Sequence, residues 1–300
     1  MITIVIPIIK FNSFSLSELT NLAKIKYKFD HLNFLFAVST ESVAKDVYTL
    51  LEKSVQNYHV MIAHSSSSNY LRSFARFAKT DFVFFHDCDD SADYYLLDEY
   101  STKDLTDDIY CFNVQKKVFD VSLKNVIKAY NLFSLDEGVI KDIKCLPTCI
   151  YGKIIPKKIL SKVDFPNLPY SQDWAISYQL YFLCKHLYVN RVLYYYNNYP
   201  SSSSSKNKST LFGTNRVNVY GHNLIRKIRN LGYSYEADFL AHRYAILLNE
   251  RYRQIGHNYF ENHISLQLLF HDFKFHYFCS FIYRYIQSIY KYIEFFFQKK

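Results

Sequence analysis

Three aspartates directly follow a continuous run of apolar residues. Residues 82–85 read FVFF, and Asp87, Asp89 and Asp90 come immediately afterwards. The run predicts a strand buried on both faces, and ligands of open parallel α/β sheets bind at the carboxyl ends of such strands. In extended geometry Asp87 and Asp89 share one side of the strand. Two carboxylates held together repel each other unless a cation lies between them.

Mg²⁺ or Mn²⁺ is the cation that this pair of carboxylates predicts. These hard ions take carboxylate oxygens and keep other coordination positions for phosphate oxygens. The pair therefore indicates a site for a metal ion and a diphosphate. Aspartate is also common in solvated turns, so the pair alone is a weak signal. Asp90 and Asp93 are interpreted as turn residues only.

The first 90 residues contain the elements that must position this site. Short apolar runs predict strands, and the amphipathic segments between them predict helices. The predicted strands are 2–8, 32–38, 58–63 and 82–85, and the predicted helices are 15–27, 43–55 and 70–79. Strands alternating with helices indicate an α/β fold with a mostly parallel sheet and helices on both faces.

The chain changes character after a serine-rich loop that follows Pro200. Before the loop, strands are predicted at 110–114 and 188–196, and a helix at 174–187. The low-complexity loop marks a predicted domain boundary. Residues 1–205 are therefore predicted to form the α/β domain, and 206–300 an all-helical C-terminal region.

The composition narrows the classes of partner and compartment. A formal net charge of +9 favours anionic partners, but the basic residues are scattered without a recognition motif, so nucleic acid is not expected. The six cysteines contain no Cys-x-x-Cys pair, which disfavours a zinc site, and free buried thiols fit a reducing cytosol. The apolar N-terminus has no basic region before it, so a signal peptide is not expected. These features predict a cytoplasmic protein.

The last 30 residues predict a basic amphipathic helix. Its apolar stripe contains Phe278, Phe281, Ile282, Tyr285, Ile286, Ile289, Ile293 and Phe296. Such a helix can lie in a membrane interface, which would hold the protein on the inner face of the plasma membrane. It can equally pack on the main domain or form a dimer contact. It is too charged to predict a transmembrane span.

Five segments, taken in order, resemble the family 2 glycosyltransferases of the GT-A fold, of the type that builds bacterial surface polysaccharides. They read ITIVIPI, NYLRS with ARFAKTDFVFFHDCDD, CIYGKIIPKKIL, DFPNLPYSQDWAIS and RVLYYYNNYPSSS, within residues 1–205. The resemblance implies a hexosyltransferase that uses a nucleotide-sugar donor, with a UDP-sugar expected. It also implies a glycan or lipid-linked acceptor in capsule, lipopolysaccharide or other cell-surface polysaccharide synthesis.

The resemblance further implies roles for individual residues. Asp89 would be the main ligand to Mn²⁺ or Mg²⁺, and Asp87 would contact the ribose or the metal. Asp173 would be the general base that deprotonates the acceptor, with inversion at the transferred carbon. Arg72 would contact the nucleotide. Asp173 can instead be only a helix N-cap, and Arg72 only a surface charge.

The sequence departs from the family pattern at two positions. The backbone at Pro7 and Ile8 would edge the nucleotide base, but the next strand ends in Ser39, where the family usually has an acid. Ser39 is therefore the expected nucleotide contact there. Gln172 replaces the first acid of the usual Glu-Asp motif and can orient an acceptor by hydrogen bonds. These departures support an alternative, a catalytically degenerate GT-A domain that binds a partner or a glycan.

Overall fold

The computed structural model describes residues 1–11, 13–24, 29, 31–51, 57–119, 126–168, 172–198 and 211–254. The chain divides into two units, Met1–Lys206 and Asn207–Lys300. The serine-rich loop and the C-terminal amphipathic segment lie outside the described residues, so the boundary and the membrane contact stay predictions. In the part of the chain that is described, no helix is long and apolar enough to cross a membrane.

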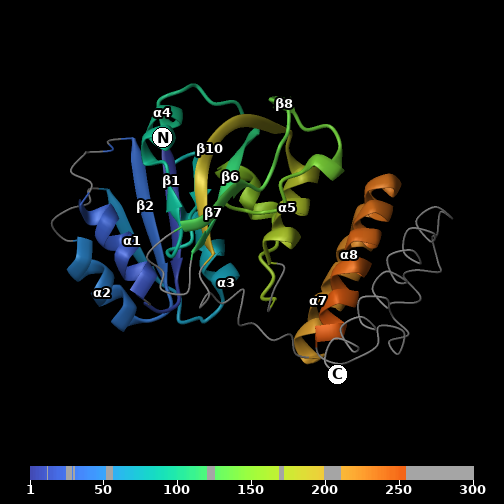
Figure 1. Cartoon of the computed structure of the whole chain (residues 1–300), viewed down its shortest axis with the longest axis horizontal. Helices are drawn as coiled ribbons and strands as arrows, with labels where there is room; N and C mark the ends of the chain where they lie inside the picture. The colour runs from blue at the N-terminus through green and yellow to red at the C-terminus, as the bar shows by residue number, and fades with distance from the viewer. Residues whose placement is uncertain are drawn as a thin grey trace. The chain divides into compact units, whose positions relative to one another are not determined.

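A mixed sheet forms the centre of the first unit (Figure 1). Among the described residues its strand order is β3-β2-β1-β4-β9-β6-β10-β5, with β7 paired to β6 and β8 paired to β10. The strands are β1 (Ile2–Ile8), β2 (Leu32–Val38), β3 (Tyr58–Ile62), β4 (Phe82–Phe85), β5 (Ser91–Ala92), β6 (Ile109–Phe119), β7 (Val126–Asn131), β8 (Gly138–Val139), β9 (Lys153–Pro156) and β10 (His186–Asn198).

The parallel part of the sheet is the part that the apolar runs predict. β1 pairs in parallel with both β2 and β4, and β2 pairs in parallel with β3. All seven residues of β1 are buried, as expected of a central strand with helices on both faces. β9 then runs antiparallel between β4 and β6, and β10 is parallel to β6. The α/β fold prediction is confirmed.

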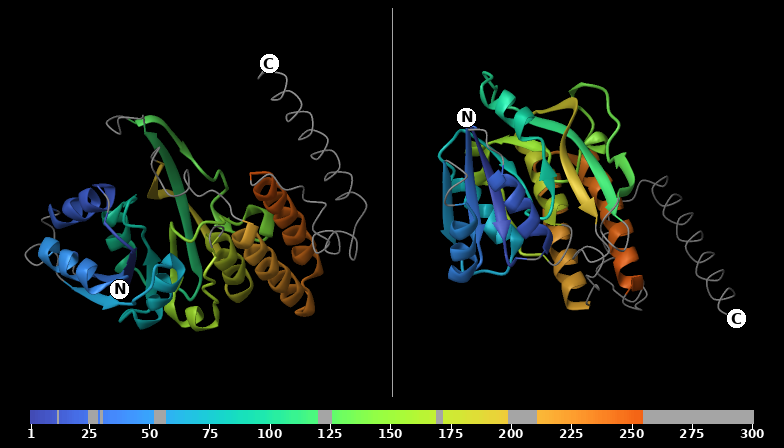
Figure 2. Two further views of the ribbon diagram at one scale, coloured as in Figure 1. Left: turned by 90° about the horizontal axis from the view of Figure 1, so that it is seen from below. Right: turned by 60° about the vertical axis from the view of Figure 1, so that its left-hand side comes forward.

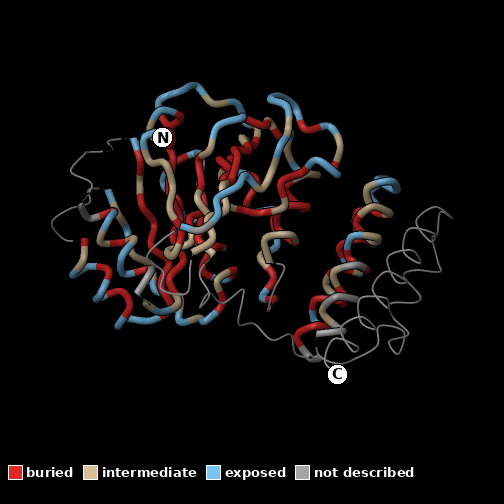
Figure 3. The backbone as a smooth tube through the Cα atoms, in the orientation of Figure 1, coloured by how far each residue is buried: buried red, intermediate tan, exposed pale blue. Residues whose placement is uncertain are grey.

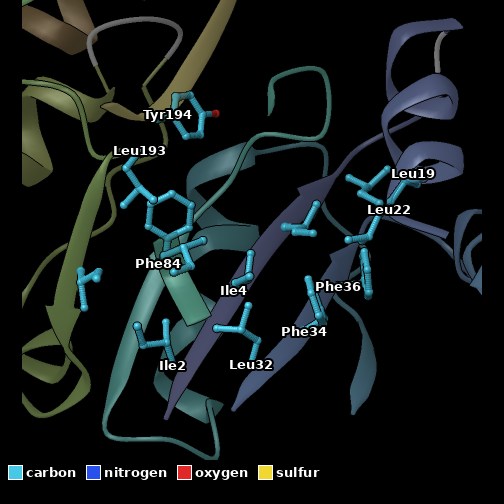
Figure 4. Close-up of a cluster of buried hydrophobic side chains, with 14 of the residues drawn as sticks. Ile2, Ile4, Leu19, Leu22, Leu32, Phe34, Phe36, Phe84, Leu193 and Tyr194 are labelled. Atoms are coloured by element: carbon cyan, nitrogen blue, oxygen red, sulfur yellow. The ribbon is translucent and has the colours of Figure 1, made fainter. Parts of the chain in front are cut away.

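Helices cover both faces of this sheet, and each face has its own apolar cluster. The helices are α1 (Ser13–Lys24), α2 (Glu41–Leu51), α3 (Ser68–Ser73), α4 (Tyr94–Ser101) and α5 (Gln172–Leu183). Residues of α1, α2 and α4 pack on one face, where Leu19 and Leu22 lie near Phe36 (Figure 4). Ile176 and Leu180 of α5 belong to the cluster on the other face. The tube view shows the buried strands between these partly exposed helices (Figure 3).

Two predicted helix boundaries are wrong. The helix predicted at 174–187 ends at Leu183. Leu187, which was predicted to be its last residue, instead belongs to β10 and pairs with Tyr110 of β6. The helix predicted at 70–79 is α3 followed by a 3₁₀ turn over Phe74–Phe77. The five described cysteines are free; Cys111 and Cys149 are buried, Cys88 and Cys184 are partly buried, and Cys145 is exposed.

The described part of the second unit is a pair of helices, α7 (Leu211–Asn230) and α8 (Ser234–Gln254). The helices approach each other closely at Gly221, where an added Cβ atom would lie 2.0 Å from Cζ of Tyr244. Tyr244 is 1% exposed, so its ring has little room to move. Arg229 also bonds Asp238 at 2.9 Å across the turn between the helices. A glycine is therefore required at this crossing.

Gly221→Ala is expected to lower the free energy of unfolding, although alanine favours helix over glycine by about 1 kcal/mol. The reason is steric, because overpacking a buried contact costs about 1–3 kcal/mol. Urea unfolding followed by circular dichroism measures the change. Asn223→Ala is the matched control, because it adds the same residue at an exposed position of the same helix. A Gly221→Ala protein as stable as the Asn223→Ala protein would contradict the close approach of α7 and α8.

Candidate active site

The aspartates after β4 lie in a turn, not in an extended strand. The ladder between β1 and β4 ends at Phe85, and the His86 N–H makes one more bond, to the Val5 carbonyl at 3.0 Å. The Asp90 N–H then donates to the Asp87 carbonyl at 3.1 Å and closes the turn. The expectation that strand alternation places Asp87 and Asp89 on one side is therefore wrong. The turn is what brings these carboxylates together.

Arg72 of α3 joins two of the predicted site residues. Its Nη2 atom donates to both carboxylate oxygens of Asp87, at 2.7 and 2.8 Å, and Nη1 donates to Oδ1 of Asp173 at 2.8 Å. Arg72 is 5% exposed, so the interpretation as a surface charge is wrong. Although burial lowers it, the charges of Asp87 and Asp173 raise the pKa of Arg72 above its ordinary value. The guanidinium stays charged and links the end of β4 to α5.

Asn69 orients this arginine, and the sequence did not single it out as a site residue. Its Oδ1 accepts from Arg72 Nη1 at 3.2 Å, and its Nδ2 donates to the Pro166 carbonyl at 2.9 Å. Asn69 is fully buried. Its position three residues before Arg72 on one helix is the signal that could have found it, because such residues are neighbours on a helix surface.

Asp173 lies in the first turn of α5, which begins at Gln172. It is therefore not simply the N-cap that precedes the helix. Burial raises the pKa of Asp173, and the nearby Arg72 opposes this rise. The N-terminal end of a helix favours negative charge, so the fold tolerates the carboxylate there. Gln172 donates to the Leu168 carbonyl, and its predicted role in orienting an acceptor stays a prediction.

The buried side chain of Lys153 bonds α5. It is 1% exposed, and its ammonium group donates to the Pro147 carbonyl at 2.6 Å, to Ser177 Oγ at 3.0 Å and to the Cys149 carbonyl. Ser177 is four residues after Asp173, so both lie on one face of α5. The charge of Lys153 acts to lower the pKa of Asp173. The lysine thus ties the loop before β9 to the helix that carries the carboxylate.

Asp89 is the remaining carboxylate of the predicted metal pair. Burial, with a further contribution from the charge of Asp87, raises the pKa of Asp89 to about 6. Burial also raises the pKa of Glu18 on α1 to about 7, and the charge of Asp89 adds to that rise. Among the described residues, no lysine or arginine lies within ion-pair distance of Asp89. Its negative charge is therefore less compensated than that of Asp87.

The carboxylates of Asp87 and Asp89 could hold a divalent ion only if other ligands completed its coordination shell. In the described residues no group of three or more His, Cys, Asp or Glu side chains could hold a metal ion. Mg²⁺ is commonly held by one or two carboxylates, with waters and substrate phosphates as its other ligands. Asp89 and Asp87 suit this kind of site, although Arg72 engages both carboxylate oxygens of Asp87.

Asp90 belongs to the turn, as predicted, but it is buried and anchors the turn to a distant strand. It is 1% exposed, and its carboxylate accepts from Tyr194 Oη at 2.6 Å and from the Asn197 N–H at 2.8 Å. Tyr194 Oη also accepts from the Asp87 N–H at 3.1 Å. These bonds fix the aspartate turn to the end of β10. Asp93 is also structural, because it caps α4 by accepting from the Leu96 N–H.

Tyr151 lies over this anchor, and Gly152 allows it to do so. Gly152 has a φ of +72°, and an added Cβ atom there would lie 2.7 Å from Val114 Cγ2. The Tyr151 ring stacks on Tyr194, with centroids 4.6 Å apart and planes 16° apart. The sequence segment around Gly152 therefore positions an aromatic ring against the tyrosine that holds Asp90.

Pro7, Ile8 and Ser39 form a separate group at the ends of β1 and β2. The Ser39 N–H donates to the Ile8 carbonyl at 3.0 Å, and Ser39 Oγ donates to the Ile9 carbonyl. Pro7 and Ile8 are buried strand residues. The structure brings these three residues together, but no bond among the described residues joins them to the Arg72 group. Their contact with a nucleotide stays a prediction.

No protein-family model matches the chain, and no curated protein matches it. Solved structures of Staphylococcus aureus TarS are similar to it. TarS 1–349 in complex with UDP-GlcNAc has 15% sequence identity and a TM-score of 0.58, covering 84% of this chain and 72% of that chain. The complex of the same fragment with UDP has a TM-score of 0.55 at 15% identity and the same coverage.

A longer TarS structure gives a consistent result, with a TM-score of 0.54 at 15% identity; 84% of this chain matches 43% of that one. Identity at this level shows the fold alone, so membership of family 2 stays a prediction. The Arg72 group and the aspartate turn lie in the mixed α/β fold of the GT-A glycosyltransferases.

Proposed function

We propose that the chain is a glycosyltransferase that moves a sugar from a nucleoside-diphosphate sugar, with UDP as the expected nucleotide, to a hydroxyl of a glycan acceptor. The observation that carries the proposal is the buried Arg72 guanidinium, which holds Asp87 and Asp173 together. It does so in a GT-A fold, and one similar solved structure, TarS, is bound to UDP-GlcNAc. The acids thus meet where a donor and an acceptor could meet.

On the donor side, Asp89 and Asp87 would hold a Mn²⁺ or Mg²⁺ ion. When bound, such an ion neutralises the negative charge that grows on the leaving nucleoside diphosphate. Asp89 contributes the less compensated carboxylate, since Arg72 engages Asp87. Asp90 and Tyr194 keep the turn in place through their buried hydrogen bond. The proposed donor contacts at Pro7, Ile8 and Ser39 rest on the family resemblance.

On the acceptor side, Asp173 is proposed as the general base. Its side chain is 28% exposed, so a hydroxyl can approach it from solvent. Burial raises its pKa toward the range in which a carboxylate accepts a proton more readily. Arg72 and Lys153 oppose a further rise, which keeps the ionised form accessible. Attack by the deprotonated hydroxyl opposite the leaving group would invert the transferred carbon.

The proposal also covers the enzyme family, the pathway and the cellular location, which rest on the sequence resemblance. It comprises a family 2 hexosyltransferase in capsule, lipopolysaccharide or other bacterial surface-polysaccharide synthesis. The protein would work in the cytoplasm, on an acceptor that is a glycan or is linked to lipid. The C-terminal amphipathic helix would bring it to the inner face of the membrane.

Asp89→Ala is expected to abolish the Mn²⁺-dependent release of nucleoside diphosphate from the donor. The donor is first found by screening UDP-, GDP- and TDP-sugars for thermal stabilisation, because a ligand that binds only the folded state raises the melting temperature. Coupled detection of the released nucleoside diphosphate then measures turnover. The loss follows from removal of the carboxylate that would hold the metal.

Asp46→Ala is the matched control, because it removes an exposed aspartate of α2. Unchanged release in Asp89→Ala would show that the metal assignment is wrong. If calorimetry detects no metal-dependent nucleotide binding by the wild-type chain, the catalytic proposal fails. The non-catalytic alternative would then stand, and it is consistent with the bonds that Ser39 and Gln172 make to backbone carbonyls.

Asp173→Asn is expected to lower donor turnover by about 10²–10⁴-fold, the usual contribution of a general base. Asparagine can still accept the hydrogen bond from Arg72 but cannot accept the proton. Donor binding, measured by the thermal shift, should therefore persist. Asp164→Asn is the control, since Asp164 is exposed and lies outside the site. Turnover within twofold of the control would rule out Asp173 as the base.

A further inference from the structure

A row of tyrosines and lysines leads away from the aspartate turn along one face of the sheet. It crosses β10, β6 and β7, which lie side by side (Figure 2). We call it the Tyr–Lys row, and its members are Tyr151, Tyr194, Tyr196, Lys116, Tyr130 and Lys128.

The strand register places the strand members of the row on a common face. Lys116 of β6 is paired with Tyr196 of β10 on one side and with Tyr130 of β7 on the other. Lys128 is paired with Val118, two residues beyond Lys116. Paired residues of neighbouring strands point to the same face, and so do residues two apart on one strand. The row is therefore a product of the register.

Ring and ammonium groups contact each other along the row. Tyr151 stacks on Tyr194 and also on Tyr196, with centroids 5.8 Å apart and planes 6° apart in the second pair. The Lys116 ammonium lies 5.7 Å from the Tyr196 ring centroid. The Lys128 ammonium lies 5.0 Å from the Tyr130 ring centroid. Cation–π contacts of this kind hold lysine side chains in place without neutralising their charge.

The inner end of the row touches the candidate active site. Tyr194 donates to Asp90 at 2.6 Å and accepts from the Asp87 N–H. Burial raises the pKa of the Tyr151 hydroxyl, and the negative charges of Asp173 and Asp90 raise it further. Tyr194 is buried, so it connects the row to the aspartate turn from within the protein. A chain that lay along the accessible rings would therefore lead toward this turn.

The outer end of the row is open and positively charged. Tyr130 is 40% exposed, and Lys128 is exposed. The described residues of this sheet extension, 115–119 and 126–131, include three lysines and no acidic residue. In the described chain, no carboxylate lies within ion-pair distance of Lys116 or Lys128. Their charges remain available to a ligand.

We propose that the Tyr–Lys row binds an anionic carbohydrate chain, which is the acceptor of the reaction proposed above. The inference rests on that proposed function. Tyr194 is buried, so the partly exposed rings of Tyr151, Tyr196 and Tyr130 are the ones that a ligand can contact. Their flat faces suit the apolar faces of sugar rings, and tyrosine hydroxyls suit sugar hydroxyls. The lysines suit carboxylate or phosphate groups on the chain. With strands about 4.8 Å apart, the span from β10 to β7 is about 10 Å, enough for about two sugar units.

Binding of the full chain to immobilised polygalacturonate, a polymer of sugar carboxylates, tests the proposal at physiological ionic strength. Neutral dextran is the comparison surface. Wild-type protein should bind polygalacturonate and not dextran. The double variant Lys116→Gln/Lys128→Gln should bind polygalacturonate several-fold more weakly than Lys45→Gln/Lys162→Gln, which removes two exposed lysines elsewhere in the first unit. Tyr130→Thr should also weaken binding, whereas Tyr48→Thr, at a similarly exposed tyrosine, should not.

Equal losses in the two double variants would show attraction by net charge alone and would overturn the proposal. Equal binding to dextran would overturn the anionic requirement. Flotation with phosphatidylglycerol vesicles measures whether the row binds lipid instead. If the row variant loses vesicle binding but keeps polygalacturonate binding, the row is a lipid contact and the proposal is wrong. Because these assays contain no donor, their failure is distinct from a failure of nucleotide release, which would refute the proposed function instead.

Discussion

A buried arginine that neutralises two carboxylates is the constraint on which the site depends. Arg72 lies on α3, Asp87 follows β4, and Asp173 opens α5, so three separate elements must meet within hydrogen-bond distance. Removing charges from water is costly, and loss of either carboxylate would leave the buried Arg72 charge less compensated. The order of β1, β4 and β9 in the sheet is what brings the three elements to one edge.

The groups around this ion pair bond several polar atoms that burial would otherwise leave unpaired, although Arg72 Nε has no hydrogen-bond partner among the described residues. Asn69 joins Arg72 to the loop at Pro166, and Lys153 joins the loop before β9 to α5. Asp90 joins the aspartate turn to β10. Each of these side chains is buried. Asn69 and Asp90 bond backbone groups of distant segments, and Lys153 bonds nearby carbonyls together with the Ser177 hydroxyl of α5. Such networks specify one arrangement, because a partly satisfied buried network is costly.

The sequence predicts the strands and helices of this fold better than it predicts the side-chain contacts of the candidate site. The runs at 2–8, 32–38 and 82–85 are strands, as expected of short, continuous apolar segments. The helices between them account for the parallel direction of these strands. β7 was not predicted, since most of its described residues are exposed and give no buried apolar run. The site acids Asp87, Asp89 and Asp173 were found from type, spacing and resemblance. The bonds that Asp90 makes were not predicted, because its partners Tyr194 and Asn197 are more than 100 residues away and no local pattern marks such a contact.

The charges of the site and of the Tyr–Lys row have opposite signs, and this contrast constrains how an acceptor could bind. At the candidate site, Asp87 and Asp173 bond a single guanidinium, and Asp89 adds a third carboxylate in the same turn as Asp87. An anionic group would be repelled there unless a cation came with it. Along β6 and β7 the charges are positive. A chain that carries its anionic groups away from its reacting end would be attracted by the row, while only its neutral hydroxyl enters among the carboxylates. The same contrast would separate the acceptor from the diphosphate of the donor, which in the proposed reaction would need a metal ion at Asp89.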